Sequence, residues 1–170
     1  AMGATYAQDF SDAQIKLIGT AEVAGAVGLI VPAATGILPI LTPIAGAQGE
    51  PVQVWLTYPP GFDPKRKWPV LHSIHGGPHT AAGDTWHWRW NTQVFAAQGY
   101  VVAGVNYHGS SSFGHAFLDS ISGRWGALEL QDVEAATDWL VRKPWIDRKR
   151  LFATGGSYGG YLVAWMNARL

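Results

Sequence analysis

The stretch Gly155-Gly156-Ser157-Tyr158-Gly159-Gly160 decides the fold of this chain, because its glycines surround a serine between two regular elements. Residues 150–154 before it are typical of a strand, and a helix is expected to start at Ser157. A strand that passes directly into a helix needs a tight turn, in which glycine neighbours let the serine backbone adopt a strained conformation. The pattern predicts a turn that presents the Ser157 hydroxyl as a nucleophile at the positive end of the helix. A phosphate-binding loop and a plain tight turn are the alternatives.

Residues 49–170 alternate between strand patterns and helix patterns. The expected strands are residues 52–58, 68–74, 100–105 and 150–154. The expected helices are residues 90–98, residues 126–142 and the helix that follows Ser157. Strands that alternate with helices form a mostly parallel sheet with helices packed on it. The fold class predicted for this part is therefore α/β.

A second glycine-rich motif, His75-Gly76-Gly77-Pro78-His79, follows the expected strand 68–74. In α/β-hydrolases, a glycine-rich turn after the third strand supplies one backbone N–H to the oxyanion hole, and the residue after the nucleophile supplies the other. Here these donors would be Gly76 or Gly77 and Tyr158. Residues without side chains matter in such a turn because a side chain would block the developing oxyanion. The alternative is a β-turn with no catalytic role.

Together these motifs resemble the catalytic domain of the prolyl oligopeptidase family, in the branch that holds acylaminoacyl-peptidases and dipeptidyl-peptidases. The resemblance runs from about Gly49 to Leu170. The stretches that carry it are His72–His79, Gly99–Val102, Asn106–Ser111, Gly126 with Glu129 and Asp132, and Gly155–Tyr161. It implies an α/β-hydrolase fold, no cofactor, and cleavage of a small ester or peptide substrate by Ser157.

The sequence also departs from that family. In the family a β-propeller precedes the catalytic domain, and the acid and base follow the serine in the order Ser, Asp, His, many tens of residues later. None of these is matched here, so we expect a truncated hydrolase sheet that ends just after the serine turn. His75, His79 and His108 are the candidate bases, because they follow predicted strands at the edge where α/β sites assemble. Ser157 with such a base would hydrolyse activated esters weakly.

A metal-dependent hydrolase is the second hypothesis. Three histidines around Zn²⁺ with an open coordination position would hydrolyse an ester or a phosphoester without a catalytic triad. The third hypothesis is an inactive fragment that exists as a homo-oligomer, because the predicted strand 151–154 would leave an open apolar edge.

Two acidic residues and three tryptophans are also singled out by their spacing. Glu129 and Asp132 lie three residues apart on the predicted helix, and we expect them to hold the loop 106–111 by hydrogen bonds rather than to act as acids. Trp86, Trp88 and Trp90 alternate around His87 and are expected either to line the site or to pack in the core.

Residues 1–48 differ sharply from the rest of the chain. Between Lys16 and Glu50 the one charged side chain is Glu22, and a capping box at residues 11–14 predicts a helix that runs to Val31. Residues 5–47 resemble the DoxX-like family of small membrane proteins, which implies a fusion of a 1–48 segment with a 49–170 hydrolase segment. Because prolines at positions 32, 39 and 43 divide the apolar run, we favour an apolar helical hairpin over residues 17–47 that covers the rest of the chain. A membrane anchor is the alternative.

Composition limits the partners. The formal net charge is zero and no Lys/Arg run occurs, which argues against nucleic acid as a partner. The chain has no cysteine, so disulfides and thiolate metal sites are excluded. Because a covering role is favoured for the apolar segment over a membrane anchor, we expect the protein to be soluble rather than membrane-bound. The sequence does not identify its compartment.

Overall fold

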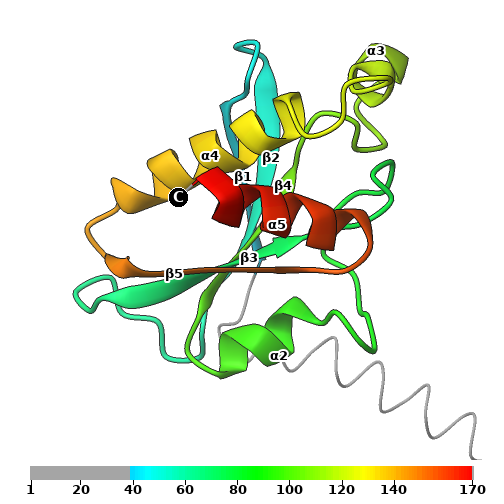
Figure 1. Cartoon of the computed structure of the whole chain (residues 1–170). Coiled ribbons are helices and arrows are strands. Elements are labelled where there is room, and N and C mark those ends of the chain that lie inside the picture. The colour runs from blue at the N-terminus through cyan, green and yellow to red at the C-terminus, as the bar shows by residue number, and fades with distance from the viewer. Residues whose placement is uncertain (1–38, 170) are drawn as a thin grey trace, which may run out of the picture. The chain divides into compact units, whose positions relative to one another are not determined.

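The computed structural model describes residues 39–169, which belong to one compact unit. The elements in chain order are β1 (Pro39–Ala45), β2 (Pro51–Thr57), β3 (Trp68–Ile74), α2 (Thr92–Ala97), β4 (Val101–Asn106), α3 (His115–Asp119), α4 (Leu128–Val141), β5 (Ile146–Gly155) and α5 (Tyr158–Arg169). Helices α4 and α5 lie on one face of the sheet, and α2 lies on the other (Figure 1). The described residues therefore form an α/β sandwich of three layers.

The five strands form one mixed sheet in the order β1-β2-β4-β3-β5. Strand β3 pairs in parallel with β4 on one side and with β5 on the other. Strand β2 pairs antiparallel with both β1 and β4. The parallel arrangement predicted from the sequence is confirmed for β3, β4 and β5, and the antiparallel strands β1 and β2 extend that sheet on one side. Strands β3 and β5 end at the same edge, which brings His75 near Ser157.

Strand β1 corrects the prediction made for the N-terminal segment. The helical hairpin was expected to reach Ala47, but residues 39–45 form a strand that pairs with β2, so the helix prediction is wrong there. Pro43 has no backbone N–H and cannot extend a helix, whereas the edge of a sheet tolerates it. Pairing with β2 also buries Ile44 in the core. The predicted helix 12–31 and the rest of the hairpin lie outside the described residues.

The other element boundaries differ from the predictions by a few residues. Helix α2 starts two residues later than expected, because Asn91 Oδ1 accepts the backbone N–H groups of Gln93 and Val94 and so caps the helix. Strand β5 begins at Ile146 rather than at residue 150. The sequence did not predict this start, because the charged residues 147–150 interrupt the apolar pattern of a strand. In the structure Ile146 pairs with Trp68 and is buried.

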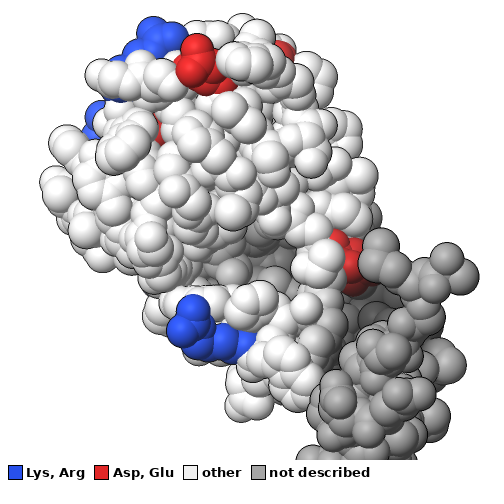
Figure 2. All heavy atoms as spheres, turned by 90° about the vertical axis from the view of Figure 1, so that its right-hand side faces the viewer, with Lys and Arg blue, Asp and Glu red and all other residues white. Residues whose placement is uncertain are grey.

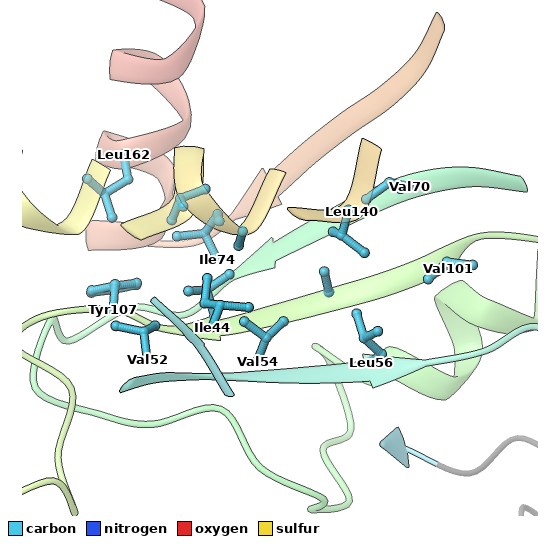
Figure 3. Packing of buried hydrophobic residues seen from close by; sticks show 14 of the residues in the cluster. Ile44, Val52, Val54, Leu56, Val70, Ile74, Val101, Tyr107, Leu140 and Leu162 are labelled. Carbon is cyan, nitrogen blue, oxygen red and sulfur yellow. The ribbon is translucent and has the colours of Figure 1, made fainter. Parts of the chain in front are cut away.

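The core fills the space between the sheet and helices α4 and α5. Strand β3 alternates buried and half-buried residues, whereas every residue of β4 is buried, as expected for a central strand. Figure 3 shows Leu140 of α4 and Leu162 of α5 closing over side chains of the sheet, among them Ile74. This packing fixes α5 against the end of β3, and thereby fixes the turn that carries Ser157.

Within residues 39–169, no helix combines the length and the apolar character that crossing a bilayer requires.

Candidate active site

Ser157 occupies the turn between β5 and α5. Strand β5 ends at Gly155, and α5 begins at Tyr158, so only two residues make the connection. The φ angle of Ser157 is 55°, in the left-handed region that residues with a Cβ seldom adopt. This residue is exposed, whereas Tyr158 and Gly159 beside it are buried. The strained turn expected from the sequence is therefore present, and it leaves the Ser157 side chain accessible.

Gly76 lies directly against this turn. A β-carbon on Gly76 would sit 3.5 Å from the Cβ of Ser157 and 3.0 Å from the carbonyl oxygen of Gly156. Both Gly76 and Ser157 line a cavity of about 440 Å³, whereas Gly77 is exposed and does not line it. The structure thus brings together the two glycine-rich motifs, and of the two glycines weighed as oxyanion donors Gly76 is the one beside Ser157.

The backbone of Tyr158 supplies the second candidate donor. Tyr158 is the first residue of α5, and the first N–H groups of a helix have no carbonyl partner within it. The helix dipole adds a partial positive charge at the same end. A backbone N–H at this position is therefore available to a negative oxygen held next to Ser157.

The side chain of Tyr158 has a different role, because it is buried and points away from the cavity into the core. Its hydroxyl donates a hydrogen bond to Oε1 of Glu129, and the backbone N–H of Gly126 donates to the same oxygen at 3.1 Å. Burial, together with the Glu129 carboxylate, raises the pKa of the Tyr158 hydroxyl. This buried pair ties α5 to the start of α4, so Glu129 has a structural role, but its hydrogen bonds go to Tyr158 and Gly126 and not to the loop 106–111 that it was expected to hold.

His75 lies at the cavity, where its ring bonds to Ser110 and to the carbonyl of the next residue, Gly76. Its Nε2 lies 2.8 Å from Ser110 Oγ, and its Nδ1 lies 2.9 Å from the carbonyl oxygen of Gly76. Because a carbonyl only accepts, the ring is protonated on Nδ1, and its Nε2 accepts the Ser110 hydroxyl. Burial lowers the pKa of His75. The imidazole also stacks on Tyr107, at 4.2 Å between ring centroids. In residues 41–169 no hydrogen bond joins Ser157 Oγ to a histidine, so the role of His75 as a base stays a prediction.

His108, another of the three candidate bases, lies in a separate buried cluster that does not line the cavity. Its Nδ1 is 2.7 Å from Asp132 Oδ2, and its Nε2 is 3.4 Å from Glu50 Oε1. Asp132 also accepts the backbone N–H groups of His108 and Ala47. Desolvation raises the pKa of Asp132, and these hydrogen bonds offset part of that effect. The prediction that Asp132 holds the loop 106–111 is confirmed, and the base role of His108 stays a prediction.

The three-histidine zinc site is not assembled by the described residues. His79 Nδ1 bonds to the carbonyl oxygen of Gly109, and His72 is buried beside Thr137 on α4. Among residues 41–169, the group with metal-ligand spacing is instead Glu50, His108 and Asp132, whose ligand atoms lie within 4.8 Å of one another. This mixed set of one imidazole and two carboxylates suits a divalent cation.

Of the three tryptophans expected to line the site or to pack in the core, Trp90 alone takes one of these roles. Trp90 lines the cavity, but Trp86 and Trp88 are exposed and do not. The part of the cavity wall around Ala82 is held by Asn106, whose side-chain oxygen accepts the Ala82 N–H at 2.6 Å and whose NH₂ group donates to the Ala82 carbonyl at 3.0 Å.

Sequence reasoning missed the residues that fix the loop of His75. Tyr107 donates its hydroxyl to the His75 carbonyl, and Thr80 donates to the Gly76 carbonyl. Together with Ser110, they hold the backbone that faces Ser157. The available signal was the stretch Asn106–Ser111, which the resemblance had marked without giving its side chains a function.

Two family models match the chain. Residues 86–169 match the prolyl oligopeptidase family, and residues 1–48 match the DoxX-like family. The first match contains Ser157, the tryptophan stretch and the loop 106–111. The second covers the segment whose composition differs from the rest of the chain.

Similar proteins are named dipeptidyl-peptidases. The chain is 40% identical over 116 residues to a probable dipeptidyl-peptidase 5 of Aspergillus terreus, which covers 68% of this chain and 16% of that protein. It is 35% identical over 149 residues to dipeptidyl-peptidase 5 of Porphyromonas gingivalis, which covers 84% of this chain and 22% of that protein. The chain thus spans about a fifth of the length of these relatives.

Solved structures agree with these matches. An acylaminoacyl peptidase of Pyrococcus horikoshii superposes with a TM-score of 0.68 at 28% identity, over 75% of this chain and 20% of the other. Dipeptidyl peptidase 4 of Porphyromonas gingivalis superposes with a TM-score of 0.66 at 30% identity, over 74% of this chain and 18% of the other. Both neighbours are α/β-hydrolase peptidases. The resemblance drawn from the motifs is confirmed: this chain is related to the prolyl oligopeptidase family through residues 86–169 and to the DoxX-like family through residues 1–48.

Proposed function

We propose that this chain is a serine hydrolase that cleaves ester or peptide bonds through Ser157. The observation that carries the proposal is the left-handed Ser157, accessible at the wall of a cavity and in contact with Gly76. The printed names of the relatives, dipeptidyl-peptidase and acylaminoacyl peptidase, support small peptides as the natural substrate class. Because the chain spans about a fifth of those proteins, their whole activity is a proposal for this one.

The chemistry requires three groups around the scissile carbonyl. Ser157 Oγ attacks the carbonyl carbon and forms a C–O bond, and its proton passes to a general base. The carbonyl oxygen becomes an oxyanion, which the backbone N–H groups of Tyr158 and Gly76 stabilise. The proton then moves to the leaving alcohol or amine as its bond to carbon breaks. Water repeats the sequence on the acyl-enzyme and releases the acid.

The reaction also needs a general base that takes the proton from Ser157 Oγ. In the family the base is a histidine that follows the serine in the chain, after the acid. Among the described residues, His75 and the exposed His87 are the histidines that line the cavity, and the half-buried His75 has an Nε2 lone pair that faces Ser110. A rotation of the Ser110 hydroxyl frees this nitrogen to take a proton. We infer that His75 is the base for weak esterase activity, and that full activity needs the family's own histidine.

The test is the hydrolysis of 4-nitrophenyl acetate by the wild type, by Ser157→Ala and by Ser122→Ala. Ser122 is an exposed serine that bonds to Asp119 and does not line the cavity, so it controls for the loss of any serine hydroxyl. We expect Ser157→Ala to reduce the rate to that of buffer and Ser122→Ala to leave it unchanged. A Ser157→Ala variant as active as the wild type would rule out serine catalysis.

A metal-dependent hydrolase is the second candidate, and the cluster of Glu50, His108 and Asp132 is the observation that favours it. A divalent cation held there would polarise a carbonyl or activate water. Against this candidate, no member of the cluster lines the cavity, and both Asp132 oxygens already accept hydrogen bonds. Treatment with EDTA in the same assay separates the two functions, because only metal catalysis is lost with the chelator and restored by zinc.

A further inference from the structure

One wall of the cavity is a turn held by the side chain of His87. The ring Nδ1 of His87 accepts two backbone N–H groups, that of Arg89 at 3.1 Å and that of Trp90 at 2.9 Å. Asn91 then caps α2 directly after the turn. Two side-chain caps in succession fix the backbone from His87 to the start of the helix, so the residues between them hold set positions at the cavity.

Trp90 connects this turn to the nucleophile. A β-carbon on Gly156, the residue before Ser157, would lie 3.0 Å from Cζ2 of the Trp90 indole. The indole therefore covers the backbone of the serine turn. A substrate bound at Ser157 meets the face formed by Trp90 and, next to it in the chain, Arg89.

Arg89 is the one formally charged residue that lines the cavity in the described part of the chain. Every other lining residue is glycine, alanine, isoleucine, threonine, serine, histidine or tryptophan. Within residues 41–169, no carboxylate lies close enough to Arg89 to form an ion pair. Figure 2 shows a face of the molecule that is mostly uncharged, with few basic and acidic side chains. A substrate in the cavity thus meets a single positive charge.

We propose that Arg89 makes this site selective for substrates that carry a carboxylate in the acyl group held beside Ser157. The inference rests on the proposed function and names its substrate class. A guanidinium binds a carboxylate through two parallel N–H donors, and such a charge-assisted pair is stronger than a neutral hydrogen bond. Arg89 is exposed, so dissolved salt screens part of this attraction.

The test compares two esters that differ in one group. In mono-4-nitrophenyl glutarate the acyl chain ends in a carboxylate, and in 4-nitrophenyl valerate a methyl group replaces it. We expect the wild type to favour the glutarate in kcat/KM. We expect Arg89→Gln to lower the ratio of the two kcat/KM values about tenfold, the loss of one charge-assisted contact. Arg89→Lys should retain part of the preference, and Arg89→Glu should reverse it.

Arg142→Gln is the matched control, because Arg142 is exposed at the end of α4 and does not line the cavity. It should leave the ratio unchanged. An Arg89→Gln variant with the ratio of the wild type overturns the inference, and so does a fall of equal size in Arg142→Gln.

A binding measurement keeps the inference separate from the proposed catalytic function. Calorimetry of Ser157→Ala with 4-phenylbutyrate and with 4-phenylbutan-1-ol reports binding without turnover. If the carboxylate binds more tightly and Arg89→Gln in the same background removes the difference, Arg89 selects anions even where no ester is hydrolysed. If both compounds bind equally, or if the difference survives without Arg89, the inference fails whatever the esterase assay gives.

Discussion

Gly159 of α5 lies against the backbone carbonyl of Ile74, the last residue of β3, so that a β-carbon at Gly159 would overlap that oxygen. This contact seats the first turn of α5 on the end of the central strand. It also sets the height of Ser157 above the sheet, because Ser157 lies two residues earlier. The backbone packing of Gly159 thus positions the candidate nucleophile.

Gly159→Ala should therefore destabilise the protein and remove activity together. An added methyl group that meets backbone has no flexible neighbour to displace, and overpacking of this kind costs about 1–3 kcal/mol of unfolding free energy. Gly160→Ala is the matched control, because its β-carbon would lie 3.3 Å from the Gly155 carbonyl. Its smaller clash is offset by the gain of about 0.5–1 kcal/mol for alanine over glycine in a helix. Urea unfolding of both variants checks the difference, and equal stabilities would refute the close packing.

Ser157→Gly should be more stable than Ser157→Ala, although both lack the hydroxyl. A residue with a Cβ is strained at φ 55°, by roughly 1–2 kcal/mol, and glycine is not. Alanine keeps the strain, so the difference between the two variants measures it without any effect of the hydroxyl. Glycine also gives the unfolded chain more freedom, which reduces the expected difference to about 1 kcal/mol. Urea denaturation midpoints provide the measurement, and an alanine variant that is equally stable would contradict a left-handed Ser157.

Stability should fall below neutral pH because of His72. Burial lowers the pKa of His72 to about 4 from its usual value of 6.5. Protons therefore bind the unfolded chain first, and stability is lost as the pH falls from 6.5 towards 4. Linkage gives a loss of about 2 kcal/mol from this residue between pH 7 and pH 5. His75, whose pKa burial also lowers, adds to the same loss.

His72→Gln checks this assignment, because glutamine keeps an N–H for Thr137 and does not titrate. The variant should lose about 2 kcal/mol less than the wild type between pH 7 and pH 5 in urea unfolding. The exposed His115 supplies the control, and His115→Gln should follow the wild type. A wild type equally stable at both pH values would show that His72 is not buried as described.

The protein should form a dimer or a larger oligomer through the edge of β5. In the described part of the chain β5 pairs with β3 alone, and Leu151 and Phe152 on it are exposed. An unpaired strand edge with apolar side chains invites a second strand. Light scattering should give more than the mass of one chain, and Phe152→Lys should shift the mass towards the monomer. Val94→Lys, a change at an exposed apolar residue of α2, should not. A monomeric wild type would count against this edge.

The sequence predicted the elements whose patterns are local. Strand β3 was predicted with its observed bounds, and the other strands and helices of residues 49–169 were predicted within four residues, except the short helix α3 (His115–Asp119), which was not predicted. Strand β1, which precedes these residues, was predicted as part of a helical hairpin. Its prolines and apolar residues are compatible with a broken helix, and only the pairing with β2 makes it a strand. The long apolar pattern favoured a helix, but residues 39–45 form a strand because they pair with β2.

The candidate site was predicted in its residues but not in its contacts. Ser157, Tyr158 and Gly76 could be named from the glycine motifs, because a tight turn leaves a clear composition. The sequence could not predict that His75 and His108 lie in different places, because both histidines follow predicted strands. Only the packing shows that one lies at the cavity and the other is held by Asp132.

The amino-acid sequence by itself determined that a serine stands between glycines at a strand-to-helix turn, because backbone strain restricts which residues can stand there. The tertiary structure decided which groups surround that serine. Gly76, Trp90 and Arg89 come from segments some 65–80 residues away, and hydrogen bonds and packing between strands bring them to Ser157. Turn chemistry is local and readable in sequence, whereas a cavity exists only after distant segments have packed together.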